Sequence, residues 1–292
     1  MTTPDNNTPP ARRPPRARVT RQPVAPASYK LSNADARAQM EHYGVPRESI
    51  EHDFVISHVL AAIAPLRDQF VFYGGTALSR TILDGLRLSE DIDLLSIGPR
   101  PTVAKALDDA IRTRLARSFG KVTAEPSLTA AKRDTEACIY QIGDTQLRIQ
   151  LIDGRNYIPL PHCTALVHQR YHALPDLELT TPTPAGFVVA KTMAWSDTTR
   201  NAPRDLYDLW ALATAGHITA EAARTYRRIG PTGGYPKPWN LPTGAPSPDE
   251  WFASLNHQCQ PQVTPQEAHN VTLAAWHHAV TAAEQSPLQT EH

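Results

Sequence analysis

The spacing of apolar positions between residues 50 and 160 predicts a mixed sheet with helices packed on it. Apolar side chains recur at helical spacing from Glu51 to Gln69, and a short β-rich run from Phe70 to Tyr73 then stops at two glycines. A short helix is expected from Ala77 to Leu83, and the alternating residues from Asp91 to Ile97 predict a second strand. The order along the chain is therefore strand, glycine turn, helix and strand.

One further helix and three further strands complete this α+β region. The helix, with proline in its first turn, is expected from Pro101 to Phe119. The strands are expected at Lys121 to Glu125, Ala137 to Ile142 and Gln146 to Ile152. The Gly-Asp pair between the last two strands indicates a hairpin.

The second half of the chain is predominantly helical. Helices are expected at Pro184 to Ser196, Pro203 to Ala215, Thr219 to Arg228 and Pro265 to Glu284. The stretch from Gly230 to Pro248 is rich in glycine and proline and predicts a long loop, which at this length is usually functional or mobile. We therefore expect a tail over residues 1–28, an α+β domain over 29–160 and a mainly α-helical domain over 161–292.

Length and composition are those of a globular protein without a membrane span. The 292 residues suffice for about two domains of roughly 100–200 residues each. No apolar run reaches the ~20 residues that a membrane span needs. The first thirty residues lack the apolar stretch of a signal peptide, so we expect a cytoplasmic protein. The three cysteines are far apart and odd in number, which argues against a disulfide framework.

The first 28 residues are basic and rich in proline, although the whole chain has zero net charge. Lysine plus arginine and aspartate plus glutamate both total 29, so the chain as a whole presents no basic field to a nucleic acid. The tail holds five arginines, seven prolines and one acid, which predicts a disordered segment of polyproline-like character. It is either a solvated tail or an arm that binds phosphates electrostatically.

Glycines, a hydroxyl and two carboxylates lie close together around the first two predicted strands. Gly74 and Gly75 follow a strand directly, so their backbone N–H groups can approach a phosphate, and the Thr76 hydroxyl adds a donor. Asp91 and Asp93 are two residues apart on a strand, which places both carboxylates on one face about 7 Å apart. Mg²⁺ fits such a pair, because it prefers carboxylates together with substrate phosphates. This pattern predicts a site for a nucleoside triphosphate (NTP) and Mg²⁺.

Each part of this pattern also has an ordinary structural explanation when it stands alone. Gly-Gly-Thr is usually a turn, and Asp-Ile-Asp is usually a solvated strand edge. A lone lysine such as Lys191 usually extends to solvent, and Arg204 with Asp205 could form a surface ion pair. Their combination in this order favours a functional site. The chain lacks the full motif sets of protein kinases and of P-loop NTPases, which excludes both classes.

Four stretches spanning most of residues 70 to 215 carry a resemblance to a known family. They are GGTAL at Gly74 to Leu78, RLSEDIDL at Arg87 to Leu94, AKTMA at Ala190 to Ala194 and RDLYDLW at Arg204 to Trp210. In these stretches the chain resembles the AbiEii/AbiGii-type nucleotidyltransferase toxins, including the MenT group, within the polymerase-β-like superfamily. The resemblance implies an α+β fold in which a mixed sheet with helices is followed by an α-helical domain that completes the active site.

The resemblance also implies roles for individual residues. Gly75 and Thr76, with the adjoining Gly74, are expected to bind the nucleotide phosphates, and Asp91 and Asp93 are expected to bind Mg²⁺. Lys191 is expected to contact the triphosphate, and Asp205 is expected to be an acidic catalytic partner. Asp208 follows Asp205 by one helical turn and is expected to be a buried orienting group.

The activity that the resemblance implies is template-independent transfer of a nucleoside monophosphate from an NTP to an acceptor hydroxyl. Such an enzyme would be the toxin of a toxin–antitoxin or phage-defence pair, with a cognate antitoxin as partner. For the MenT group the acceptor is the 3′ end of tRNA, and the modification blocks aminoacylation. Two alternatives stay open: a transferase that modifies a protein or small molecule, and a catalytically silent nucleotide-binding module.

One position departs from the pattern of the superfamily. Polymerase-β-like enzymes commonly carry a third carboxylate on a later strand, where this chain has Gln150. An amide cannot act as a base. Either Lys191 and Asp205 take over this function, or Asp153 at the end of the strand supplies the charge.

Ser89 enters the strand that carries both aspartates and is a further candidate for nucleotide binding. Its hydroxyl could donate to a phosphate, or it could simply cap the turn. A phosphate added to Ser89 would place negative charge beside the triphosphate site, so phosphorylation there is a hypothesis for an off-switch.

Overall fold

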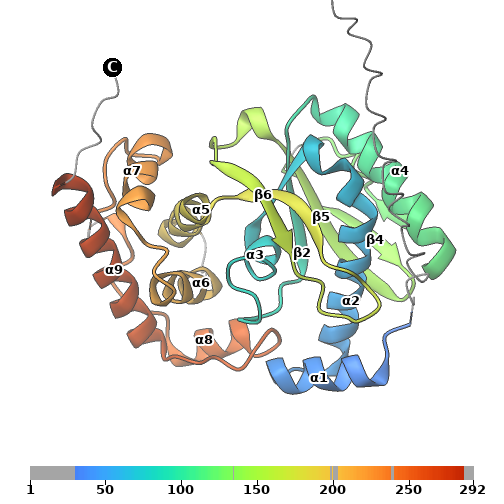
Figure 1. The fold of residues 1–292 in the computed structure, drawn as a ribbon, viewed down its shortest axis with the longest axis horizontal. Coiled ribbons are helices and arrows are strands. Elements are labelled where there is room, and N and C mark those ends of the chain that lie inside the picture. The colour runs from blue at the N-terminus through green and yellow to red at the C-terminus, as the bar shows by residue number, and fades with distance from the viewer. Residues whose placement is uncertain (1–29, 134, 198, 200–202, 238–239, 286–292) are drawn as a thin grey trace, which may run out of the picture.

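The computed structural model describes residues 30–133, 135–197, 199, 203–237 and 240–285, so the predicted tail over residues 1–28 lies outside the described residues. Figure 1 shows a mixed sheet flanked by helices on one side of the molecule and a group of helices on the other. The five strands of the sheet are arranged in the order β1-β2-β5-β4-β3. They are β1 Phe70–Tyr73, β2 Asp91–Ser96, β3 Thr123–Glu125, β4 Cys138–Ile142 and β5 Thr145–Asp153.

The central pair, β2 and β5, is parallel, and the other neighbours are antiparallel. Successive residues of each strand point to opposite faces, so alternate apolar residues can pack under helices while their neighbours face the other way. The helices on the apolar face are α2 Arg47–Ile63 and α4 Arg100–Phe119. Their buried side chains form one cluster with Ile92, Leu94, Ile149 and Leu151 of the central strands. This packing leaves Asp91, Asp93 and Gln150 on the opposite face.

The helical region lies beside that opposite face (Figure 1). It consists of α5 Pro184–Ser196, α6 Pro203–Thr214, α7 Ala220–Ile229, α8 Pro248–Leu255 and α9 Pro265–Gln285. Helix α6 packs against α5, α8 and α9. A second, two-stranded sheet, β6 His162–Val167 with β7 Leu177–Pro182, joins the two regions, and β7 lies against β1. One cluster of buried hydrophobic residues continues from the sheet into α6 and α9.

These elements confirm the α+β fold with a helical C-terminal region and most of the predicted segments. The hairpin between β4 and β5 turns at Gly143, whose φ of 57° suits glycine. The helix between β1 and β2 differs: α3 spans Gly74–Leu78, so it begins directly after the strand and ends earlier than predicted. The remaining elements are α1 Asn33–Tyr43, η1 Ala64–Gln69 and η2 Gly154–Asn156.

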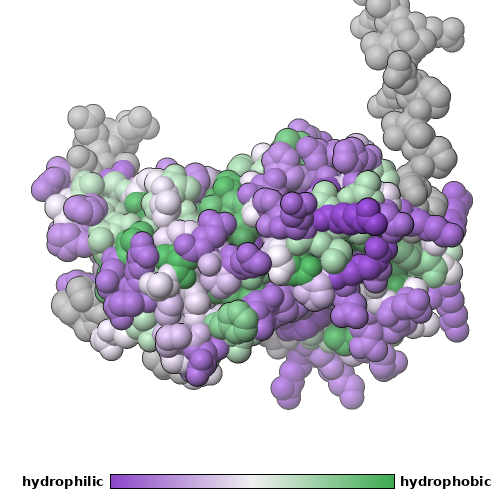
Figure 2. Space-filling model, turned by 90° about the horizontal axis from the view of Figure 1, so that it is seen from below, coloured by the Kyte–Doolittle hydropathy of each residue, from purple (hydrophilic) through white to green (hydrophobic). Residues whose placement is uncertain are grey.

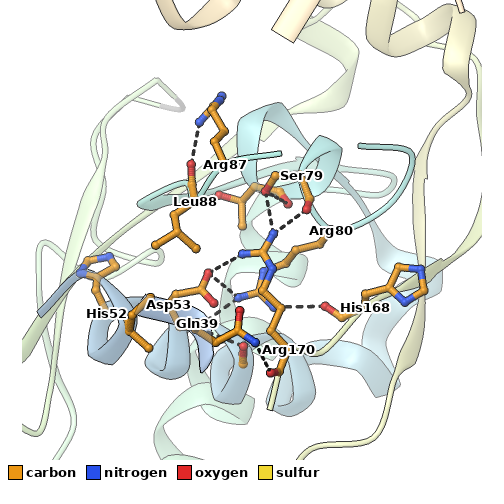
Figure 3. A network of polar contacts seen from close by, with 12 residues as sticks. Gln39, His52, Asp53, Ser79, Arg80, Arg87, Leu88, His168 and Arg170 are labelled. Carbon is orange, nitrogen blue, oxygen red and sulfur yellow. Dashed lines mark hydrogen bonds and ion pairs between the residues drawn. The ribbon is translucent and has the colours of Figure 1, made fainter. Parts of the chain in front are cut away.

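A buried ionic network anchors the segment that follows α3. Asp53 of α2 accepts from Arg80 at 2.8 Å and from Arg170 at 2.9 Å, and all three side chains are at most 5% exposed. Tyr171 donates its hydroxyl to the same carboxylate at 2.8 Å. Figure 3 shows Asp53 facing both guanidinium groups, with Arg170 reaching on to Ser79. The network therefore holds residues 79–80 against α2.

The surface is mixed in polarity on the face that Figure 2 presents. Hydrophobic residues lie there in small groups among hydrophilic ones. In the part of the chain that the structure describes, no helix is both long enough and apolar enough to cross a membrane.

Candidate active site

A cavity of about 730 Å³ lies between the polar face of the sheet and helices α5 and α6. Strands β1, β2 and β5 contribute its floor, and the two helices contribute the wall opposite. Seven of the eight residues predicted for the site line it: Gly74, Gly75, Ser89, Asp91, Asp93, Lys191 and Asp205. The structure thus brings together residues from four separate stretches of the sequence.

The two strand carboxylates lie side by side on the cavity floor. Asp91 and Asp93 alternate with buried Ile92, which places both on the face that the cavity occupies. Arg148 of β5 donates to Asp91 at 3.0 Å, and both side chains are partly exposed. In the sheet register, Asp93 lies between Tyr73 of β1 and Gln150 of β5.

Gly74 and Gly75 allow the backbone to pass close to cavity side chains. Gly74 has a φ of +80°, and a Cβ atom there would lie 2.3 Å from Asp93 Oδ2. At Gly75 a Cβ atom would lie 2.9 Å from Arg87 Nη2 and 3.0 Å from Ser89 Oγ. Side chains at these positions would therefore fill the space beside Asp93 and Ser89.

Thr76 is the predicted residue that does not line the cavity. Its side chain is buried, and its hydroxyl donates to the backbone carbonyl of Asp91. The structure gives this hydroxyl a backbone partner, and its contact with a phosphate stays a prediction. The hydrogen bond ties α3 to the first residue of β2.

Lys191 lies at the cavity wall between two carboxylates of α6. Its ammonium group is 2.8 Å from Asp205 Oδ1 and 2.7 Å from Asp208 Oδ2. Burial disfavours the ammonium form, but the two carboxylates outweigh this effect and raise the pKa of Lys191 above its ordinary value. Lys191 therefore carries its charge throughout the physiological pH range.

Asp208 is buried, as expected, and it connects Lys191 to Arg87. Arg87 donates from Nε and Nη2 to the two oxygens of Asp208, each at 2.7 Å. Burial disfavours the Asp208 carboxylate, but Arg87 and Lys191 outweigh this effect and hold its pKa below the ordinary value. Arg87 also donates to Gln258 at 2.7 Å. Arg87 begins the RLSEDIDL stretch, but no local pattern in the sequence indicates its contact with Asp208.

Gln150, at the position of the missing third carboxylate, and Asp153, a candidate to replace its charge, point to opposite faces of the sheet. Gln150 lies beside Asp93 and donates to the backbone carbonyl of Thr135. Successive side chains of β5 point to opposite faces, so Asp153 points away from the cavity face on which Gln150 lies. It pairs with Arg155 at 2.6 Å, and this hydrogen-bonded partner lowers the pKa of Asp153 to about 2. Asp153 therefore does not supply the third charge, whereas Lys191 and Asp205 remain at the cavity.

The donor set suits a cation that is bound together with a substrate. Among the described residues, no group of three or more histidine, cysteine, aspartate or glutamate side chains could hold a metal ion. Asp91 and Asp93 provide two carboxylates, and the missing side chain of Gly74 leaves room beside one of them. Mg²⁺ commonly takes one or two protein carboxylates and completes its shell with phosphates and water. The site therefore fits Mg²⁺ with a phosphorylated ligand.

Comparisons with known proteins identify a family for most of the chain. Residues 58–254 match the family model described as the nucleotidyl transferase AbiEii toxin of a type IV toxin–antitoxin system. The structure is similar to MenT4, a nucleotidyltransferase toxin from Mycobacterium tuberculosis H37Rv, with a TM-score of 0.59 and 16% identity over 88% of this chain and 93% of that one. A protein from H. pylori assigned as a nucleotidyltransferase gives a TM-score of 0.49 at 16% identity, covering 82% and 98% of the two chains. No curated protein matches the sequence.

Proposed function

This chain belongs to the AbiEii family of nucleotidyltransferase toxins from toxin–antitoxin systems. We propose that it transfers a nucleoside monophosphate from an NTP to the 3′ end of tRNA. The observation that carries the proposal is the meeting of Asp91, Asp93, Lys191 and the Gly74–Gly75 turn in one cavity. A carboxylate pair, a buried cation and exposed backbone at glycines are the features that a bound triphosphate requires.

The residues of the cavity divide into those for phosphate and those for metal. Asp91 and Asp93 would hold Mg²⁺ together with the triphosphate, and the bound ion would supply charge neutralisation at the reacting phosphate. Lys191 adds a fixed positive charge, because Asp205 and Asp208 hold its ammonium group in place. Gly75 and Ser89 would bring a backbone N–H and a hydroxyl to the phosphate oxygens.

The reaction breaks a phosphoanhydride bond of the NTP and forms a phosphodiester bond to the acceptor. The acceptor hydroxyl oxygen attacks the α-phosphorus, the bond to the β-phosphate bridging oxygen breaks, and pyrophosphate leaves with that electron pair. The hydroxyl proton must pass to a base, and we assign this role to Asp205. Asp205 lines the cavity together with Lys191. Gln150 occupies the position of a third strand carboxylate, but an amide cannot accept the proton.

The acceptor, the partner and the location are parts of the same proposal. A tRNA 3′ end offers a free hydroxyl, and a nucleotide added there would prevent aminoacylation and stop translation. Since NTPs and tRNA are cytoplasmic, we place the enzyme in the cytoplasm, with a cognate antitoxin as partner. Ser89 lines the cavity, so a phosphate on its hydroxyl would compete with the triphosphate.

The experiment that tests the acceptor is incubation with each α-labelled NTP, Mg²⁺ and total tRNA, followed by a denaturing gel. We expect label on tRNA that is lost when the 3′ hydroxyl is oxidised with periodate beforehand. Label on protein instead of tRNA would contradict the tRNA assignment. Binding of NTP without release of pyrophosphate would contradict the transferase assignment.

A further inference from the structure

One wall of the cavity is apolar and aromatic, and the phosphate chemistry does not use it. Tyr73 of β1, Ile152 of β5 and Ala190 of α5 line this wall together with Tyr157, which directly follows η2. Tyr73 and Ile152 belong to one buried cluster, against which Tyr157 and Ala190 pack. The wall is therefore built into the core of the molecule.

This wall begins directly beside the strand carboxylates. Tyr73 is the register partner of Asp93, and Ile152 lies two residues beyond Gln150, the partner of Asp93 on the other side. Strand alternation places all of them on the face that forms the cavity floor. The cavity is thus charged at the end with Asp91 and apolar at the end with Ile152.

Tyr157 is the partly exposed aromatic side chain of this wall. Its ring centroid lies 5.3 Å from that of Tyr73, with an angle of 56° between the ring planes. Tyr73 is only 8% exposed, so it supports Tyr157 from the core side. Tyr157 itself is half-buried and lines the cavity.

We propose that Tyr157, supported by Tyr73 and Ile152, is the surface on which the base of the bound NTP stacks. The proposal rests on the proposed function and adds the position of the base within the same cavity. An NTP has a charged triphosphate at one end and a flat aromatic base at the other, and the cavity has the same two ends. Stacking on an aromatic ring tolerates every base, so this wall by itself predicts weak discrimination among the four NTPs.

The test compares binding of each NTP and of inorganic tripolyphosphate, all with Mg²⁺, by isothermal titration calorimetry. Tyr157→Ala should weaken NTP binding by roughly 5- to 150-fold, the loss expected for one base–aromatic stack, and should leave tripolyphosphate binding unchanged. Tyr157→Phe should bind NTPs as wild type does, because the ring remains. Tyr157→Leu keeps apolar bulk without the ring, and it carries the same expectation as alanine if the alanine variant fails to fold.

The matched control is Tyr235→Ala, since Tyr235 is a half-buried tyrosine that contacts Arg227 and does not line the cavity. It should leave NTP binding unchanged. Equal loss of tripolyphosphate and NTP binding in Tyr157→Ala would overturn the proposal, because the residue would then act through the fold. Unchanged NTP binding with a raised KM for the acceptor would also overturn the proposal, because Tyr157 would then contact a base of the acceptor. Wild-type protein that binds no NTP would overturn the proposed function as well.

Discussion

At the scale of single residues, the cavity depends on places where no side chain fits. Gly74 combines a φ of +80° with the close approach of Asp93, and Gly75 lies against Arg87 and Ser89. A residue with a Cβ atom at Gly74 would have to displace a carboxylate that we assign to the metal. Glycine at position 74 is therefore a condition for the position of Asp93, and glycine at position 75 for the positions of Arg87 and Ser89.

Gly74→Ala should abolish most transfer activity while the fold survives. The positive φ costs an alanine about 1–2 kcal/mol, and the added methyl group also collides with Asp93. Gly216→Ala is the matched control, because Gly216 has a φ of +74° and nothing within 4 Å of the added atom. Thermal unfolding should show a stability loss in both variants, larger for Gly74→Ala because of the collision, and rates of pyrophosphate release should fall for Gly74→Ala alone. Equal activity in the two variants would contradict this account of Gly74.

Lys191→Met should lower stability by roughly 3 kcal/mol, the lower end of the range for breaking a buried ion pair, because Arg87 still pairs with Asp208. The folded-state pKa of Lys191 is raised, so its stabilising effect is complete below the unfolded value of about 10.4 and is lost as pH rises through the folded value. Urea unfolding should therefore give a constant difference from wild type between about pH 6 and 9 and a smaller one above about pH 10. A difference that shrinks between pH 6 and 9 would contradict the raised pKa.

At the scale of elements, two buried arginines fix the segment between α3 and β2. Arg80 pairs with Asp53 of α2, and Arg87 pairs with Asp208 of α6. The first contact lies in the network of Figure 3, while the second reaches the cavity. The segment that carries Ser89 is therefore held from both the sheet region and the helical region.

Arg80→Met and Arg87→Met form a matched pair that separates folding from binding. Each substitution removes a buried cation. Asp53 keeps Arg170 as a partner and Asp208 keeps Lys191, so both variants should lose roughly 3 kcal/mol of stability. Only Arg87 lines the cavity and orients Lys191 through Asp208. Calorimetry at a temperature where both are folded should show weaker NTP binding for Arg87→Met alone. The same loss in Arg80→Met would contradict a specific role for Arg87.

Local patterns made most elements predictable, and contacts distant in sequence explain the rest. Helix α5 begins and ends where its proline start and apolar spacing place it. Strand β6 was missed because four of its six residues are exposed, which removes the alternation of buried positions. Helix α8 was missed although Ser247 and Glu250 form a capping box at its start. The strand carboxylates and glycines were predictable from the motifs, whereas the pair of Arg87 with Asp208 spans 121 positions and has no local signal.

At the scale of the whole molecule, the site exists because two regions share one core. The cluster of buried hydrophobic residues runs from the sheet through α6 to α9, so floor and wall of the cavity are packed together. The floor contributes Asp91 and Asp93, and the wall contributes Lys191 and Asp205. Figure 1 shows the same division between the sheet and the helices beside it. Neither region alone contains the complete set of residues.

Nucleotide transfer in this cavity is tested by measuring label transfer from α-labelled NTP to tRNA for Asp93→Asn and for Asp109→Asn. Asp109 is an exposed aspartate of α4 that pairs with Lys105 and does not line the cavity. We predict that Asp93→Asn loses at least about 100-fold in rate, since it removes a charge placed at the reacting phosphate, and that Asp109→Asn equals wild type. Wild-type transfer that persists in folded Asp93→Asn would contradict the account.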